Sequence, residues 1–197
     1  MIMNEERFRR VIAAIDGANA DDPHRITVRG AVRQKELAHA ELATEWIRRL
    51  RPDAGEPLLL AARAHHLRRW TIPRGAYPDD RGGYLRWRRD LHDLHAGEAA
   101  RILAAEGYDQ ATVSRVGEII RKKNLGADPD AQALEDSLCL IFLETQFHDL
   151  AARLAADRMV DVLRKTLRKM SDEGKRLALT IEMPSADRAL LDRALSK

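Results

Sequence analysis

Hydrophobic residues recur along most of the chain at the three-to-four-residue spacing of helices that bury one face. In residues 4–20 they are Phe8, Val11, Ile12 and Ile15, which share one side of a helix. Further helices are predicted over about 34–50, 84–106, 109–124, 157–170 and 185–195. Runs of β-branched residues are scarce. The pattern therefore predicts an all-α fold, a compact bundle of six to eight helices.

Two segments are apolar on nearly every side, which predicts helices buried in the middle of a domain. The first, Pro57 to Trp70, begins with a proline at a tolerated first helical position. It ends in His65 and His66 followed by two arginines, groups that enter a core only with partners. The second, about 129–152, begins after Asp128 and contains a six-residue apolar run. We expect both helices to be central.

Turn-forming residues separate these helices. Loops are expected at Asp21 to Gly30 and at Thr71 to Gly83, the second with two prolines and three glycines. We expect this second loop to lie on the surface beside the functional site. Gly107 is placed to end one helix and Asp109 to cap the next. Without repeats or a linker, residues 1–197 are expected to form a single domain.

Composition and charge limit the kinds of ligand and the cell compartment to be expected. The net charge of +3 is small, and arginine, which outnumbers lysine, binds phosphate and carboxylate groups bidentately. The single cysteine, Cys139, cannot form an internal disulfide, which favours a reducing compartment. The charged N-terminal residues do not resemble a signal peptide, and the longest apolar run is too short for a bilayer. We expect a cytoplasmic protein with no membrane partner and leave its oligomeric state open.

Histidines and carboxylates lie beside the apolar segments in four places. These are His39 between Glu36 and Glu41, the pair His65 and His66, His92 and His95 on one helical face, and Glu135 with Asp136. Asp136 is in line with Leu140 and Leu143, so a straight helix points it inward, where a carboxylate needs a cation. Imidazole and carboxylate ligands suit Mn, Fe, Co, Ni or Zn. Taken singly, each histidine also fits a purely structural position.

The order of these groups resembles the HD-domain phosphohydrolase superfamily over roughly residues 34–143. The segment from His95 to Asp109, a small-residue helix followed by glycine and an acidic cap, is especially similar. The resemblance implies an HD-like helical core over about 34–150, with the helices of 157–195 packed on it. It also implies one divalent metal, with ligands drawn from His39, His65, His66, His95 and Asp136. The chain departs from the pattern where His65-His66 replaces the usual His-Asp pair.

A second resemblance covers nearly the whole chain. Its residues are Phe8–Asp16, His66–Arg74, Tyr84–Arg88, Glu135–Glu144 and Arg164–Ser171. On these segments the chain is similar to a family known as domain of unknown function 4202. This resemblance implies no particular activity.

Arginines and aromatic residues surround the histidine pair, a combination that suits a phosphate and a stacked base. The first hypothesis is a metal-dependent phosphohydrolase acting on a nucleotide or other phosphomonoester. In it Arg69, Arg74 and Trp70 bind substrate, Arg69 also offsets phosphate charge, and Glu135 handles protons. The alternative is a non-catalytic module on an HD-like scaffold that binds a nucleotide, RNA or a protein. A structural role for Trp70 as a core aromatic also stays open.

Overall fold

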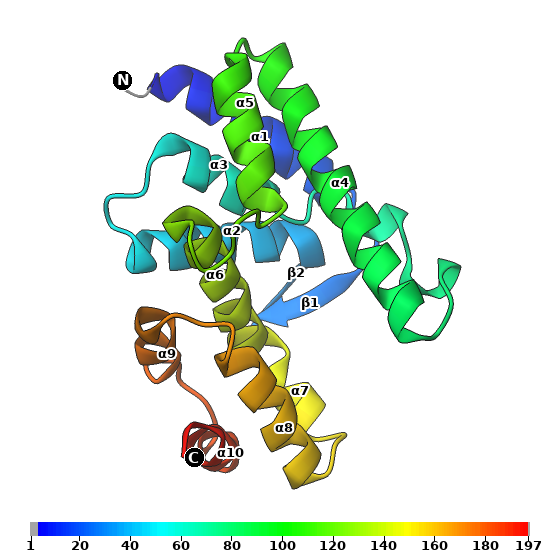
Figure 1. The fold of residues 1–197 in the computed structure, drawn as a ribbon, viewed down its shortest axis with the longest axis vertical. Coiled ribbons are helices and arrows are strands. Elements are labelled where there is room, and N and C mark those ends of the chain that lie inside the picture. Colours follow the sequence, from blue (N-terminus) through cyan, green and yellow to red (C-terminus); the bar gives the residue numbers. More distant parts are fainter. Residues whose placement is uncertain (1–3, 197) are drawn as a thin grey trace. The chain divides into compact units, whose positions relative to one another are not determined.

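The computed structural model describes residues 4–196 and is dominated by helices (Figure 1). Within that range the chain forms ten α-helices, one β-hairpin and two short 3-10 turns, so the predicted all-α class is confirmed. It divides into two compact units, one ending at Leu134 and the other beginning at Glu135, with the boundary inside one helix. In the described part of the chain, no helix is both long and apolar enough to cross a membrane.

The elements up to the boundary helix follow in this order: α1 (Glu5–Ala20), β1 (Arg25–Val28), β2 (Ala31–Gln34), α2 (Lys35–Leu50), α3 (Glu56–Ala64), 3-10 turns at Arg69–Thr71 and Arg74–Ala76, α4 (Arg81–Ala105), α5 (Gln110–Ile120) and α6 (Pro129–Thr145). The remaining elements are α7 (Phe147–Ala151), α8 (Ala156–Leu167), α9 (Asp172–Ala178) and α10 (Ser185–Leu195). The predicted helix over 129–152 is thus interrupted at Gln146, and α9 lies in a stretch for which no helix was predicted.

Helix α3 is the centre of the first unit. Leu58, Leu60, Ala61 and Ala62 are all 0% exposed, as expected for a helix that is apolar on nearly every side. It packs against α1, α2, α4 and α5, and α4 and α5 lie side by side (Figure 1). Burial of this helix therefore fixes the position of its C-terminal end, which the histidine pair follows.

The helix predicted to run to Trp70 ends earlier, at Ala64. Arg68 adopts a left-handed conformation with φ 55°, which a continuing α-helix does not accommodate. The buried side chain of Asn19 accepts a hydrogen bond from the Arg68 backbone N at 3.3 Å. At the helix end, the His65 ring lies 2.7 Å from the Ala62 carbonyl oxygen. The prediction was wrong here because tertiary contacts, not local propensity, end the helix.

The predicted loop at 21–30 contains an unpredicted strand and the turn of a β-hairpin. Strands β1 and β2 pair antiparallel, with Arg25 opposite Gln34 and Val28 opposite Ala31. Both turn residues, Arg29 and Gly30, have positive φ of 49° and 82°, as in the two-residue turns that suit hairpins. The sequence did not reveal the hairpin because each strand has only four residues and arginine replaces the usual asparagine or aspartate of the turn.

The predicted loop at 71–83 lies for the most part in the segment between α3 and α4, but α4 begins at Arg81, three residues before its predicted start at 84. Asp80 caps α4 by accepting a hydrogen bond from the Gly83 backbone N at 2.6 Å. Asp109 likewise caps α5 through Thr112 N at 2.8 Å, and Gly107 has φ 75° after α4, as predicted. Gly107 and Asp109 therefore set the two ends of the connection between α4 and α5.

The second unit is organised around α8. This helix packs against α7 and α10 and buries Met159, Val160 and Leu163 on one face. Helix α10 was predicted over the residues that it occupies, and it buries Leu191 completely. The single cysteine, Cys139, is buried in this unit.

Gly83 provides a stability test of the loop before α4. A Cβ added there would lie 2.2 Å from the Pro78 carbonyl oxygen, so Gly83→Ala is expected to lower the free energy of unfolding by about 1–3 kcal/mol. Gly97→Ala in the same helix meets nothing within 4 Å and is expected to raise it by about 0.5–1 kcal/mol. Urea unfolding of both variants measures the difference. Equal changes in the free energy of unfolding would show that the loop at Pro78 can move away from an added Cβ.

Candidate metal centre and adjoining pocket

The first turn of α2 presents a carboxylate and an imidazole on one face. Glu36 and His39 are three residues apart, which places them together on the helix surface. Both residues are 3% exposed, and His39 Nδ1 lies 3.5 Å from Glu36 Oε2. A charged carboxylate at such depth needs compensating partners.

The turn after α3 brings the histidine pair to this carboxylate. His66 Nδ1 lies 2.9 Å from Glu36 Oε2, and one potential ligand atom each from Glu36, His39 and His66 all lie within 4.8 Å of one another. The ring of His66 is 4.1 Å from that of His65 and 5.6 Å from that of His95, measured between centroids. His39 and His66, both predicted as metal ligands, thus contact Glu36, and His65 and His95 lie beside His66. Glu36 itself was noted beside His39 but was not predicted as a ligand.

Two of these histidines have a defined proton position. His65 Nδ1 lies 2.7 Å from the Ala62 carbonyl oxygen and His95 Nδ1 lies 2.8 Å from that of Leu67. Because a carbonyl only accepts, each Nδ1 donates and each Nε2 of the neutral ring keeps its lone pair. The Nε2 atoms of His39, His65 and His95 are buried without a hydrogen-bond partner in the described part of the chain. Metal-binding histidines are commonly oriented by such carbonyl contacts.

Burial sets the charge state of the cluster. It lowers the pKa of His95 to about 4, and burial together with neighbouring positive groups lowers the pKa values of His65 and His66 well below the ordinary value. For Glu36, burial alone raises the pKa, but the contacts with His39 and Arg69 outweigh it and the net shift is downward. At neutral pH, His65, His66 and His95 are therefore neutral and Glu36 is charged, the protonation state that a divalent cation requires of its ligands.

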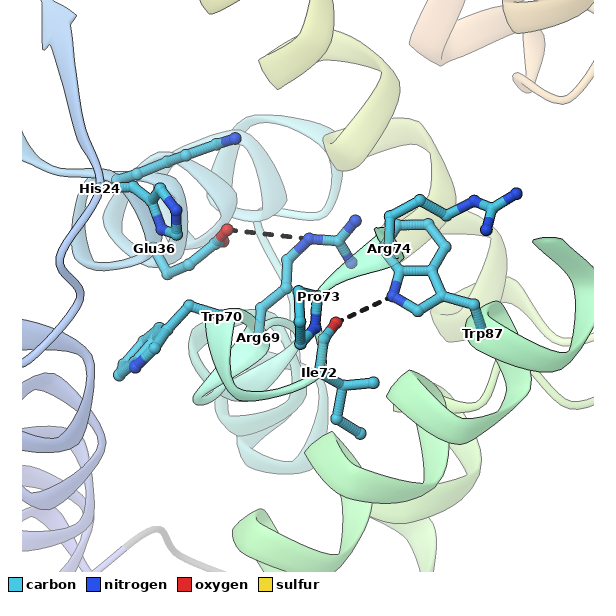
Figure 2. Close-up of a pocket in the computed structure, with 9 residues that line it drawn as sticks. His24, Glu36, Arg69, Trp70, Ile72, Pro73, Arg74 and Trp87 are labelled. Atoms are coloured by element: carbon cyan, nitrogen blue, oxygen red, sulfur yellow. Dashed lines mark hydrogen bonds and ion pairs between the residues drawn. The ribbon is translucent and has the colours of Figure 1, made fainter. Parts of the chain in front are cut away.

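A pocket of about 270 Å³ opens beside this cluster (Figure 2). Its lining comprises His24, Lys35, Glu36, Arg69, Trp70, Ile72, Pro73, Arg74 and Trp87. In Figure 2 the Arg69 guanidinium faces the Glu36 carboxylate, with 3.8 Å between Nε and Oε1. Arg69 also lies over the Trp87 ring at 4.9 Å. The indole N–H of Trp87 donates to the Ile72 carbonyl at 2.9 Å, which fixes the wall of the pocket.

Arg69, Trp70 and Arg74, the three residues predicted to bind substrate, all line this pocket. Arg69 lies in a 3-10 turn and not in the helix predicted over Pro57 to Trp70, because α3 ends at Ala64. It still reaches Glu36 because the left-handed Arg68 redirects the chain. Arg74 is held by the Tyr77 carbonyl, to which its Nη1 donates at 3.0 Å.

Asp136 and Glu135 belong to the second unit, where both are buried. Asp136 accepts hydrogen bonds from Ser171 N at 2.9 Å and from Ser171 Oγ at 2.5 Å. Glu135 Oε1 lies 3.8 Å from Lys169 Nζ. The metal-ligand role of Asp136 and the proton-handling role of Glu135 stay predictions.

The first unit thus defines a class of helical protein with a buried carboxylate–imidazole cluster beside a basic, aromatic pocket. The model of one family, described as domain of unknown function (DUF4202), matches residues 9–191, and the chain belongs to this family. Comparison with curated proteins and with solved structures gives no match.

The cluster predicts a loss of stability in acid. An unfolded histidine takes up its proton near pH 6.5, whereas folded His95 does so at about pH 4, so the unfolded chain binds more protons between these values. The free energy of unfolding should therefore fall as the pH drops through this window, with a contribution from His95 on the order of 3 kcal/mol.

His95→Gln isolates that contribution, since the amide can still donate to the Leu67 carbonyl. Urea unfolding with a chelator present, at about pH 7 and about pH 4.5, should show a smaller acid-induced loss in the variant than in the wild type. The same loss in both proteins would contradict the assignment.

Proposed function

We propose that this protein is a metal-dependent phosphohydrolase acting on a nucleotide or other phosphomonoester. The observation that carries the proposal is that Glu36 belongs both to the ligand cluster and to the lining of the pocket. A cation held by Glu36 would therefore be held at the wall of a pocket that also presents Arg69 and Arg74. Such an arrangement brings positive charge from two sources to one anionic group.

The residues of the cluster fit a divalent transition metal. Glu36, His39 and His66 would hold it, with His65 and His95 as further nitrogen donors, and mixed nitrogen and oxygen ligands suit Mn, Fe, Co, Ni or Zn. The buried Nε2 atoms without partners support this reading, because such atoms are costly unless they are satisfied. When bound, such an ion supplies Lewis acidity toward a phosphoryl oxygen and lowers the pKa of coordinated water.

The residues that line the pocket would bind the substrate. The guanidinium groups of Arg69 and Arg74 can each bind a phosphate through two parallel hydrogen bonds. The Arg69 side chain is 26% exposed, so water screens its charge less than that of a fully exposed arginine. Trp70 and Trp87 offer aromatic surface for a base. A volume of about 270 Å³ is small for a ligand site, which favours a mononucleotide or a smaller phosphomonoester over RNA.

The resemblance to HD domains supports the same function. It rests on the order of His39, the pair His65 and His66, and His95 along successive helical segments, and it is the reason to keep Asp136 as a candidate ligand and Glu135 as a candidate proton carrier. A cytoplasmic location, expected from the single cysteine, is part of this proposal.

Activity measurements on tag-free protein test the proposal. Wild type with Mn²⁺ or Co²⁺ is expected to hydrolyse members of a panel of nucleotides and simple phosphomonoesters, and a chelator should abolish the reaction. Arg69→Ala should lower kcat/KM by about 10- to 100-fold, the worth of a charged hydrogen bond of about 1.5–3 kcal/mol. Arg86→Ala, which alters an exposed arginine on α4 outside the pocket lining, is the matched control and should leave kcat/KM unchanged.

The alternatives give distinct results. Nucleotide binding that needs Arg69 but produces no turnover with any metal would replace the hydrolase with a binding module. A thermal melt of both proteins distinguishes a structural role of Arg69 from a role in binding. If the role is structural, Arg69→Ala would lower the melting temperature through lost packing on Trp87. Equal losses of activity in Arg69→Ala and Arg86→Ala would contradict the assigned pocket.

A further inference from the structure

The segment before the hairpin contains a carboxylate, Asp22, that has no part in the proposed ligand set. Its side chain is 0% exposed, and its two oxygens accept three hydrogen bonds. Oδ2 accepts from the backbone N of Glu36 at 2.9 Å. Oδ1 accepts from the backbone N of His24 at 2.9 Å and from the ring Nδ1 of His24 at 3.0 Å. Asp22 therefore joins the pocket wall, where His24 lies, to Glu36 at the centre of the carboxylate–imidazole cluster.

This contact replaces the usual local cap of a helix. The first amides of an α-helix lack partners within the helix, and a side chain at the preceding position normally accepts from one of them. For α2 that position is Gln34, whose side chain makes no such bond. The acceptor is instead Asp22, fourteen residues before Glu36 in the chain. A second tie, from Lys35 N to the His24 carbonyl at 2.9 Å, fixes the same two segments together.

We propose that Asp22 is a positioning residue of the metal centre, which holds the first turn of α2 so that Glu36 and His39 face His66. It acts through the backbone of Glu36 and is itself fixed by His24 on the pocket wall. The inference rests on the proposed function to the extent that Glu36 is a metal ligand. A local cap at Gln34 would satisfy the same kind of orphan amide but would not join the backbone of Glu36 to the segment that contains His24.

Asp22→Asn tests the role with little change in side-chain size. The amide keeps one acceptor oxygen but turns an NH₂ group toward one of the N–H donors. The affinity of tag-free protein for Co²⁺, followed by absorption titration, should fall by about 10- to 100-fold, the loss typical of partners that orient metal ligands.

Asp16→Asn is the control for lost stability. Asp16 accepts hydrogen bonds from Nε and Nη2 of Arg63, both at 2.6 Å, so the variant weakens a contact within the same unit without touching Glu36. It should keep the wild-type affinity for Co²⁺ even if its melting temperature falls. Wild-type affinity in Asp22→Asn, or an equal loss of affinity in both variants, would overturn the positioning role.

A measurement on metal-free protein keeps this inference separate from the proposed function. The ¹⁵N resonances of the His39 and His66 rings report their contacts with Glu36, and they should shift in Asp22→Asn but not in Asp16→Asn. If wild type binds no metal, the proposed function fails while such shifts still support the positioning of Glu36. Unchanged resonances in Asp22→Asn would overturn the positioning role whether or not metal binds.

Discussion

The first unit depends on one buried negative charge, the Glu36 carboxylate. A carboxylate at this depth is costly unless it is paired and hydrogen-bonded. Here it contacts the rings of His66 and His39, lies 3.8 Å from Arg69, and sits in the first turn of α2, where the helix dipole favours negative charge. His39 lies on α2 with Glu36, whereas His66 and Arg69 come from the chain after α3. Their assembly around Glu36 therefore holds the start of α2, the chain that follows α3 and the pocket wall together.

The surrounding imidazoles distinguish this cluster from a simple ion pair. A structural site would use each polar atom, whereas three buried Nε2 atoms in the described part of the chain have no partner. The neutral rings of His65, His66 and His95 cannot cancel the charge of Glu36, and the Arg69 Nε lies 3.8 Å from its carboxylate. A divalent cation would satisfy both the carboxylate and the Nε2 lone pairs, so the proposed function depends on metal binding.

The sequence predicted most helices because their apolar spacing is local information, as for 185–195, which matches α10. It missed the hairpin and the early end of α3 because left-handed residues and tertiary hydrogen bonds decide them. Four histidines of the site were predicted from their order along the chain, which resembles that of HD domains. Glu36 was not, because the sequence does not tell which neighbour of His39 turns inward; Glu41 pairs with Arg33 and Arg63 instead. Asp22 acts across fourteen residues and leaves no local signal.

The most direct test of the central claim is the metal content of protein purified without a histidine tag, measured by elemental analysis after exchange into Mn²⁺, Co²⁺ or Zn²⁺ and removal of free metal. About one ion per chain is expected in wild type. His66→Ala should lose that ion and His148→Ala should retain it, because the His148 ring lies in the second unit. Wild-type protein with negligible bound metal under all three conditions would contradict metal binding at Glu36.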